Sequence, residues 1–225
     1  MNDSTRMHTK PRIKTIFWDI GGVLLTNGWD PGQRARVLAR IGVDLARYEE
    51  LHPEANCTWE RGLTTAEDFF RTTVFEPNPA LDLSFDTLWP QVCAESKVLH
   101  PDVLDLVAEL RETGRYRMAT LNNESRELNE HRLDAFKLRP LFDYFICSGY
   151  VHEMKPLPDI YQAAIDISGY PPNTSLFIDD KQENCEAARA FGMRAIRFES
   201  PAQLRSALAS FGIESPVAEA VTASI

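Results

Sequence analysis

The sequence predicts an α/β protein in which a parallel sheet is covered by helices and interrupted by an inserted helical region. Short runs of β-branched or aromatic residues alternate with helical patterns along most of the chain, which is typical of parallel sheets. Charged and amide side chains directly follow several of these runs. One region, residues 27–96, breaks the alternation and offers helical patterns without a convincing strand. We therefore expect one α/β core that is interrupted after its first strand.

The five expected strands are short, apolar and flanked by polar or turn residues. This pattern is typical of strands in a parallel sheet, because helices bury both of its faces. Trp18 is expected to lie in the core, on the sheet face opposite its neighbour Asp19, since successive side chains alternate along a strand. The expected strands are Thr15–Trp18, Tyr116–Leu121, Tyr144–Cys147, Ser175–Ile178 and Arg194–Phe198.

Helical spacing of apolar residues predicts the elements that cover the sheet. Asp102–Arg111 and Pro158–Ile167 have this spacing, and the segment from Ser200 to Gly212 begins with a capping serine and ends at a glycine. Within the interrupting region, similar patterns occur at Gln33–Ile41 and Thr65–Val74. The inserted region is therefore expected to be helical.

The predicted organisation is a core domain at 13–26 and 97–212, an inserted helical domain at 27–96, and flexible tails at 1–12 and 213–225. Three prolines are expected to separate the helices of the insertion: Pro53, Pro77 and Pro79. Three tryptophans in or near it are expected to pack inside it rather than line a pocket: Trp29, Trp59 and Trp89.

Composition narrows the class of protein. A chain of 225 residues with 44% hydrophobic content is long enough to bury a substantial core. Its formal net charge of -9 gives no general attraction to nucleic acids or anionic membranes. The first 14 residues lack the apolar run of a secretory signal, and the longest apolar stretch is broken by Asp19 and is too short to span a membrane. The four cysteines form no C-x-x-C pair, which fits a reducing compartment. We expect a cytoplasmic protein with incidental thiols.

Polar residues follow four of the expected strands, where the carboxyl ends of a parallel sheet bind ligands. Three carboxylates and a lysine in such positions suit Mg²⁺-assisted phosphoryl transfer. They supply hard oxygen ligands, a nucleophile and a cation for developing charge. The residues are Asp19, Gly21 and Gly22 after the first strand, Thr120, Asn122 and Asn123 at the second, Lys155 after the third, and Asp179 and Asp180 at the fourth.

Four segments together resemble the motifs of the haloacid dehalogenase superfamily of hydrolases. IFWDIGGVLL resembles the first motif, TLNNES the second, EMKPLPDIY the lysine motif and SLFIDDKQENCEAARAFGM the acidic fourth motif. They occur in the family order, and the resemblance covers about residues 13 to 211. It implies a Rossmann-like core with a helical cap domain, and a Mg²⁺-dependent phosphatase acting on a small phosphorylated molecule.

The resemblance also implies a role for individual residues. Asp19 would be the nucleophile that becomes an aspartyl phosphate while its other oxygen holds Mg²⁺. Gly21 would offer its backbone carbonyl to the ion, Asp180 would bind it directly, and Asp179 would act through water. Lys155 would pair with the nucleophile and the phosphate.

Gly21 departs from many phosphatases of the superfamily, which have there a second aspartate that protonates the leaving group. Losing a general acid typically costs about 10² to 10⁴ in rate, and less when the leaving group is good. This favours sugar 1-phosphates, aryl phosphates or acyl phosphates as substrates. Alternatively, metal-bound water or the cap supplies the proton, and the polar candidates in the cap are Asp30, His52, Glu54 and Glu60.

The second motif also departs from the family pattern, in which Ser or Thr precedes Asn: either Leu121 aligns with the hydroxyl position, or a one-residue shift brings Thr120 there. Thr120, Asn122 and Asn123 therefore all remain candidates for binding phosphate. Asn184 either orders the acidic loop or simply begins a helix. The charged run from Glu124 to Arg132 is expected to be a solvated helix face.

Three functions remain open. The leading hypothesis is Mg²⁺-dependent hydrolysis of a phosphate monoester, with a sugar phosphate among the candidates. Carbon–halogen hydrolysis by the same aspartate is the second, although a dehalogenase has no need for the Asp179 and Asp180 pair as metal ligands. A non-catalytic binding protein on the same fold is the third. A monomer or a homodimer is expected, without nucleic-acid or membrane partners.

Overall fold

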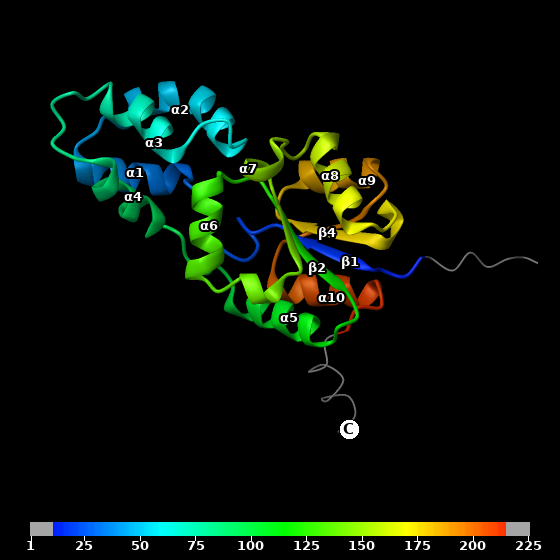
Figure 1. The fold of residues 1–225 in the computed structure, drawn as a ribbon. Coiled ribbons are helices and arrows are strands. Elements are labelled where there is room, and N and C mark those ends of the chain that lie inside the picture. Colours follow the sequence, from blue (N-terminus) through cyan, green and yellow to red (C-terminus); the bar gives the residue numbers. More distant parts are fainter. Residues whose placement is uncertain (1–10, 215–225) are drawn as a thin grey trace, which may run out of the picture.

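A five-stranded parallel sheet forms the centre of the computed structural model, which describes residues 11–214 (Figure 1). The strand order is β3-β2-β1-β4-β5, so the first strand lies in the middle. Every neighbouring pair is parallel, as the alternation of strands and helices predicts. The strands are β1 (Thr15–Trp18), β2 (Arg117–Asn122), β3 (Tyr144–Cys147), β4 (Ser175–Asp179) and β5 (Arg194–Arg197).

The register brings the carboxyl ends of the central strands together. Trp18, the last residue of β1, lies beside Thr120 of β2 and Ile178 of β4. The residues that follow these three positions therefore emerge at the same edge of the sheet. This edge is where Asp19, Leu121 and Asp179 meet.

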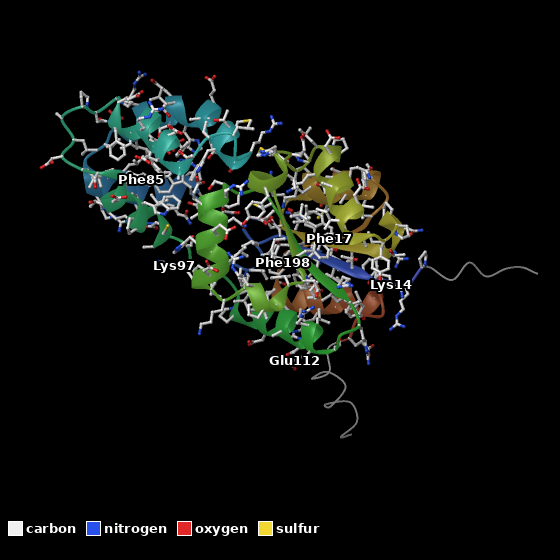
Figure 2. The ribbon with its side chains drawn as sticks, viewed as in Figure 1. Lys14, Phe17, Phe85, Lys97, Glu112 and Phe198 are labelled. Carbon is white, nitrogen blue, oxygen red and sulfur yellow. The ribbon has the colours of Figure 1, made fainter. Side chains whose placement is uncertain are left out.

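Helices cover both faces of the sheet (Figure 1). On one face, α5 (Pro101–Glu112) and α10 (Pro201–Ser210) pack apolar side chains against a cluster that includes the fully buried Trp18, as the alternation predicts. On the other face, α8 (Pro158–Ser168) and α9 (Gln182–Ala190) pack against Phe17, which Figure 2 labels. This three-layer arrangement confirms the predicted α/β core.

The inserted region is helical and has a core of its own. Its aromatic side chains, including Trp59, Phe70 and Phe85, pack against one another, and Figure 2 labels Phe85 among them. Leu128 of the α/β core joins this cluster from outside the insertion. The helices are α1 (Pro31–Ile41), α2 (Leu45–Glu60), α3 (Ala66–Phe70), the π-helix η1 (Arg71–Phe75) and α4 (Phe85–Cys93).

Two further helices of the core contact the cap. Helix α6 (Arg126–Ala135) follows β2 and contacts α4 of the insertion, and the short α7 (Ser148–Val151) follows β3 and contacts α2. Two short 3₁₀ turns, η2 (Arg139–Leu141) and η3 (Pro172–Thr174), precede β3 and β4. Thus both α6 and α7 lie between the core and the cap.

The expected elements agree with the structure except in three details. The helix expected at Thr65–Val74 is divided into α3 and η1. The expectation that Pro53 separates helices is wrong, because Pro53 lies inside α2. Of the expected tails, residues 1–10 and 215–225 fall outside the described residues, whereas Ile213 is buried against the core. No helix in the range 11–214 is long and apolar enough to span a bilayer.

Candidate active site

Asp19 is held rigidly where the chain leaves β1. Its backbone N–H donates to the carbonyl of Ile178 at 2.9 Å, which extends the pairing of β1 with β4 by one residue. Its Oδ1 accepts a hydrogen bond from the N–H of Ile20 at 2.8 Å. The chain then turns tightly, because the N–H of Gly22 donates to the carbonyl of Leu25 at 2.8 Å. The carboxylate is therefore fixed at the sheet edge, and Asp19 is 7% exposed.

Lys155 joins two of the carboxylates. Its Nζ lies 3.0 Å from Oδ1 of Asp19 and 2.7 Å from Oδ2 of Asp179. It also donates to the carbonyl of Leu121 at 3.0 Å, so its three donors are satisfied. The Asn123 side chain fixes the Lys155 backbone through two hydrogen bonds of 2.9 Å each. Two carboxylates and one backbone carbonyl, from three strand ends, thus share one ammonium group.

The two adjacent aspartates after β4 have different surroundings. Asp179 is fully buried and accepts hydrogen bonds from the Lys181 N–H at 2.8 Å and from the Asn184 side chain at 3.0 Å. Asn184 therefore orders the acidic loop, which was one of the two roles considered for it. Asp180 is half-buried, and its Oδ1 has no hydrogen-bond partner within residues 11–214.

This arrangement fits a hard divalent cation. One carboxylate oxygen from each of Asp19, Asp179 and Asp180 lies within 4.8 Å of the others. The partnerless Oδ1 of Asp180 supplies a lone pair that a cation would satisfy. Gly22 makes room for this carboxylate: its φ is +75°, and a Cβ there would lie 2.4 Å from Oδ2 of Asp180.

The charged side chains of this site shift one another's pKa values. Burial raises the pKa of Asp19 to about 7, with Lys155 opposing the shift and Asp179 adding to it. Burial also tends to raise the pKa of Asp179, but Lys155 outweighs burial and lowers it. Burial and the charge of Asp179 raise the pKa of Asp180. One ammonium group therefore does not neutralise three carboxylates, which favours an additional cation.

A cavity of about 280 Å³ lies over this sheet edge, between the core and the cap. Core and cap both contribute polar side chains to it, so a ligand inside would contact both. The lining residues are Asp19, Gly21, Asn27, Gly28, Trp29, Asp30, Pro31, Arg34, His52, Asn56, Glu60, Asn123, Arg132, Lys155, Lys181 and Asn184.

The structure separates the candidates for phosphate binding. Asn123 lines the cavity, whereas Thr120 is fully buried on the sheet face that also holds Trp18. Asn122 is also buried, and its amide donates to Oδ1 of Asn129 at 3.0 Å. Of the three, Asn123 has the position closest to what a phosphate ligand requires.

The four cap candidates for proton transfer are also separated. Asp30, His52 and Glu60 line the cavity, and Glu54 is exposed on α2 outside the lining. Trp29 lines the cavity as well as packing in the cap, although only packing was expected for it. Its φ of 49° is unusual for a bulky residue.

The expectation of a solvated face from Glu124 to Arg132 is wrong. Nη1 of Arg132 lies 2.7 Å from Oε2 of Glu124, and both side chains are almost completely buried. Arg132 also donates to the carbonyl of Thr26, just before the insertion begins. The two ends of the run thus form a buried ion pair where the cap meets the core.

Several lining residues were not recognised in the sequence. Arg34 is 8% exposed and binds Glu49 through two hydrogen bonds, and Lys181 directly follows the acidic pair. Asn56 lies on α2, which the helical patterns did not identify. The available signal was the capping Asp44 ahead of α2, because Asp at this position commonly begins a helix.

Comparison with known proteins decides the family. Residues 13–192 match the family model of the haloacid dehalogenase-like hydrolases. The chain belongs to this family. The haloacid dehalogenase-like chain is 32% identical over 194 residues to protein CbbY of Cereibacter sphaeroides, covering 82% of this chain and 83% of the relative. It is 25% identical to N-acylneuraminate-9-phosphatase of Rattus norvegicus, with 76% of each chain covered.

A third relative of this hydrolase is much longer. Protein SUPPRESSOR OF QUENCHING 1, chloroplastic, of Arabidopsis thaliana is 26% identical over 189 residues, which cover 82% of this chain but 18% of that protein. Among solved structures, the HAD family enzyme bt-2542 from Bacteroides thetaiotaomicron, in complex with magnesium and inorganic phosphate, is similar with a TM-score of 0.71. The two chains are 24% identical, with 85% of this chain and 98% of that chain covered, and the likeness shows the fold.

Proposed function

We propose that this hydrolase is a Mg²⁺-dependent phosphatase that hydrolyses a small phosphate monoester through an aspartyl phosphate on Asp19. The observation that carries the proposal is the placement of Asp19 beside Lys155 and the acidic pair at one end of the cavity. Phosphatase names among the relatives support the same reaction class.

The reaction would proceed in two displacements at phosphorus. An oxygen of Asp19 attacks phosphorus, and the bond from phosphorus to the ester oxygen breaks with its electron pair on the leaving oxygen. Water then attacks phosphorus, the bond to Asp19 breaks, and inorganic phosphate leaves. Lys155 orients Asp19 and offers positive charge to the phosphate oxygens, while Asn123 holds Lys155 in position.

Mg²⁺ would be held by Asp19 and Asp180, with the Gly21 carbonyl and, through water, Asp179. When bound, it would neutralise charge on the phosphoryl oxygens. Asn184 and Lys155 hold the oxygens of Asp179 in place by hydrogen bonds. The enzyme complex of a similar fold with magnesium and phosphate supports this assignment.

The cavity favours a small, polar substrate. Its volume of about 280 Å³ and its amide, carboxyl and guanidinium lining suit a phosphorylated sugar or a molecule of similar size. A net charge of -9 gives a nucleic-acid polymer no favourable field. We propose a cytoplasmic enzyme, active as a monomer or a homodimer, whose cap corresponds to residues 27–96.

The experiment measures phosphate release from sugar phosphates, nucleotides and an aryl phosphate, with and without Mg²⁺. Wild type is compared with Asp19→Asn and with Asp82→Asn, which changes an exposed aspartate of the cap. We expect turnover that requires Mg²⁺, is lost in Asp19→Asn and is retained in Asp82→Asn. Halide release from a 2-haloacid, or no turnover together with ligand binding, would instead favour one of the other two functions.

A further inference from the structure

The core offers no acid at the position of Gly21 to protonate a leaving group, so the cavity must obtain that proton elsewhere. Glu60, the last residue of α2, lines the same cavity as Asp19 and Lys155 but comes from the cap. A phosphoryl group seated against Asp19 would direct its ester oxygen away from the sheet, since the displacement is in line. The leaving oxygen would thus face the cap.

The end of α2 is clamped to the core. Oγ of Ser148 in α7 donates to the Glu60 carbonyl at 2.6 Å. Nε of Arg61 donates to the carbonyl of His152 at 2.9 Å, and Nδ1 of His152 lies 2.7 Å from the Arg61 carbonyl. Glu60 is therefore held relative to the core by its own backbone and by its neighbour Arg61.

Close backbone packing also attaches the end of α2 to the core. Gly62 has a φ of +65°, and a Cβ there would lie 2.2 Å from the carbonyl oxygen of Gly149 in α7. Only glycine permits this approach without displacement of one backbone. The contact holds the end of α2, which carries Glu60, close to α7 of the core. Glu54, on the same helix, is exposed and lacks such an anchor.

The groups around the Glu60 carboxyl come from both the cap and the core. Burial raises its pKa, and the nearby Asn56 amide and the charges of Lys181, Lys155 and Arg34 reduce the rise without cancelling it. Glu124, which follows β2, is close enough for the charge of Glu60 to raise the pKa of Glu124. The Glu60 carboxyl thus stays protonated to higher pH than an exposed glutamate would.

The other two cap candidates that line the cavity, His52 and Asp30, are less suited to donate a proton. Burial and the charge of Arg34 lower the pKa of His52 to about 4, so its ring is neutral at ordinary assay pH. Oδ1 of Asp30 accepts the Gln33 N–H at 2.8 Å as the cap of α1, which fixes this carboxylate at the helix end.

We propose that Glu60 is the general acid and base of the reaction, in place of the carboxyl that Gly21 lacks. As Asp19 attacks phosphorus and the ester bond breaks, the Glu60 carboxyl gives its proton to the leaving oxygen. The Glu60 carboxylate then takes a proton from the water that attacks the aspartyl phosphate. The proton count is balanced over one turnover. This proposal rests on the proposed phosphatase function.

The test compares wild type, Glu60→Gln and Glu54→Gln on a series of phosphate esters with leaving groups from p-nitrophenol to a sugar hydroxyl. An acid matters most for a poor leaving group. We therefore expect Glu60→Gln to lose about 10² to 10⁴ in kcat/KM on the sugar phosphate but less than about tenfold in kcat/KM on p-nitrophenyl phosphate. The ratio kcat/KM reports the step in which the leaving group departs, whereas loss of the base slows hydrolysis of the aspartyl phosphate equally for every ester. Glu54→Gln should match wild type throughout.

A pH profile separates a chemical role from a structural one. Wild type acting on the poor leaving group should lose activity as pH rises and Glu60 deprotonates, and Glu60→Gln should lack this limb. Thermal unfolding and the p-nitrophenyl phosphate rate report whether Glu60→Gln is folded, and Glu60→Asp, which retains a carboxyl, should keep the limb.

An equal loss of kcat/KM on all esters, or an unchanged pH limb of kcat/KM in Glu60→Gln, would overturn the Glu60 proposal while wild-type turnover leaves the phosphatase intact. If wild type itself releases no phosphate from any ester, the proposed function fails and Glu60 loses its role with it.

Discussion

Replacing Arg132 by methionine tests the buried pair that links α6 to the beginning of the cap. The change removes the 2.7 Å contact with Glu124 and the hydrogen bond to the Thr26 carbonyl, while keeping a side chain of comparable length. Glu124 would remain buried with the Ser125 N–H, 3.1 Å away, as its remaining hydrogen-bond donor in the described chain.

Breaking a buried ion pair on one side typically destabilises a protein by about 3 to 5 kcal/mol, because the remaining charge loses its partner. For a chain of this size, each kcal/mol corresponds to about 2 to 4 °C in Tm. We therefore expect Tm to fall by about 6 to 20 °C in Arg132→Met.

The loss should depend on pH. Burial raises the pKa of Glu124 to about 7 in the folded protein despite Arg132, whereas its pKa in the unfolded chain is 4.5. The contribution of this group to wild-type stability therefore falls as pH rises from 4.5 to about 7. Without Arg132 the folded pKa rises further, and the variant continues to lose stability above pH 7. The Tm difference from wild type should consequently be larger at pH 8.5 than at pH 6.

The assay is thermal or urea unfolding of wild type, Arg132→Met, Glu124→Gln and the double variant at both pH values. The double variant should be more stable than the sum of the single losses predicts, since it contains no unpaired charge. A Tm difference that is the same at both pH values, or strictly additive single losses, would refute this account of the pair.

Three further predictions concern the site and its surroundings. Gly22→Ala should displace Asp180 and reduce Mg²⁺ affinity or activity by about 10- to 100-fold, as measured by Mg²⁺ titration. Gly42→Ala is the control, because Gly42 has a similar φ of +74° but no atom lies within 4 Å of a Cβ there, and it should leave the titration unchanged. Burial and the charge of Arg34 lower the pKa of His52 to about 4, from a value of 6.5 in the unfolded chain. The folded state should therefore lose stability through this group as pH falls from 6.5 toward 4. The urea midpoint of wild type should therefore drop more between pH 7 and 4.5 than that of His52→Asn; equal drops would contradict this. Cys57 is exposed and the other three cysteines are buried, so a thiol reagent should label one site quickly, and Cys57→Ser should abolish that fast phase.

Much of the core was predictable because its signals are local. Each expected strand agrees with an observed one to within two residues, since apolar runs bounded by turn residues define strands of a buried parallel sheet. The residues after those strands could be assigned to one edge from the sequence alone, because parallel strands align their carboxyl ends. Asp19, Lys155, Asp179 and Asp180 do lie together there.

The cap and the charged run after β2 were less predictable. Pro53 suggested a break in the helical pattern, yet it lies inside α2. The run containing Glu124 and Arg132 has the composition of a solvated helix. Its burial depends on α4 packing against α6 and on Leu128 of the run entering the apolar cluster of the cap, which no local pattern specifies.

The sequence by itself determined the strands, the order of the motifs and the set of charged side chains at the sheet edge, since these depend on periodicity and on the ends of parallel strands. Only the tertiary structure decided which of Thr120, Asn122 and Asn123 reaches the cavity, and which cap carboxyl is fixed above Asp19. The first choice depends on Asn123 binding the backbone of Lys155, 32 positions away, and the second on how the end of α2 packs against α7, a contact between residues about 90 positions apart. Such contacts have no signature in either segment alone.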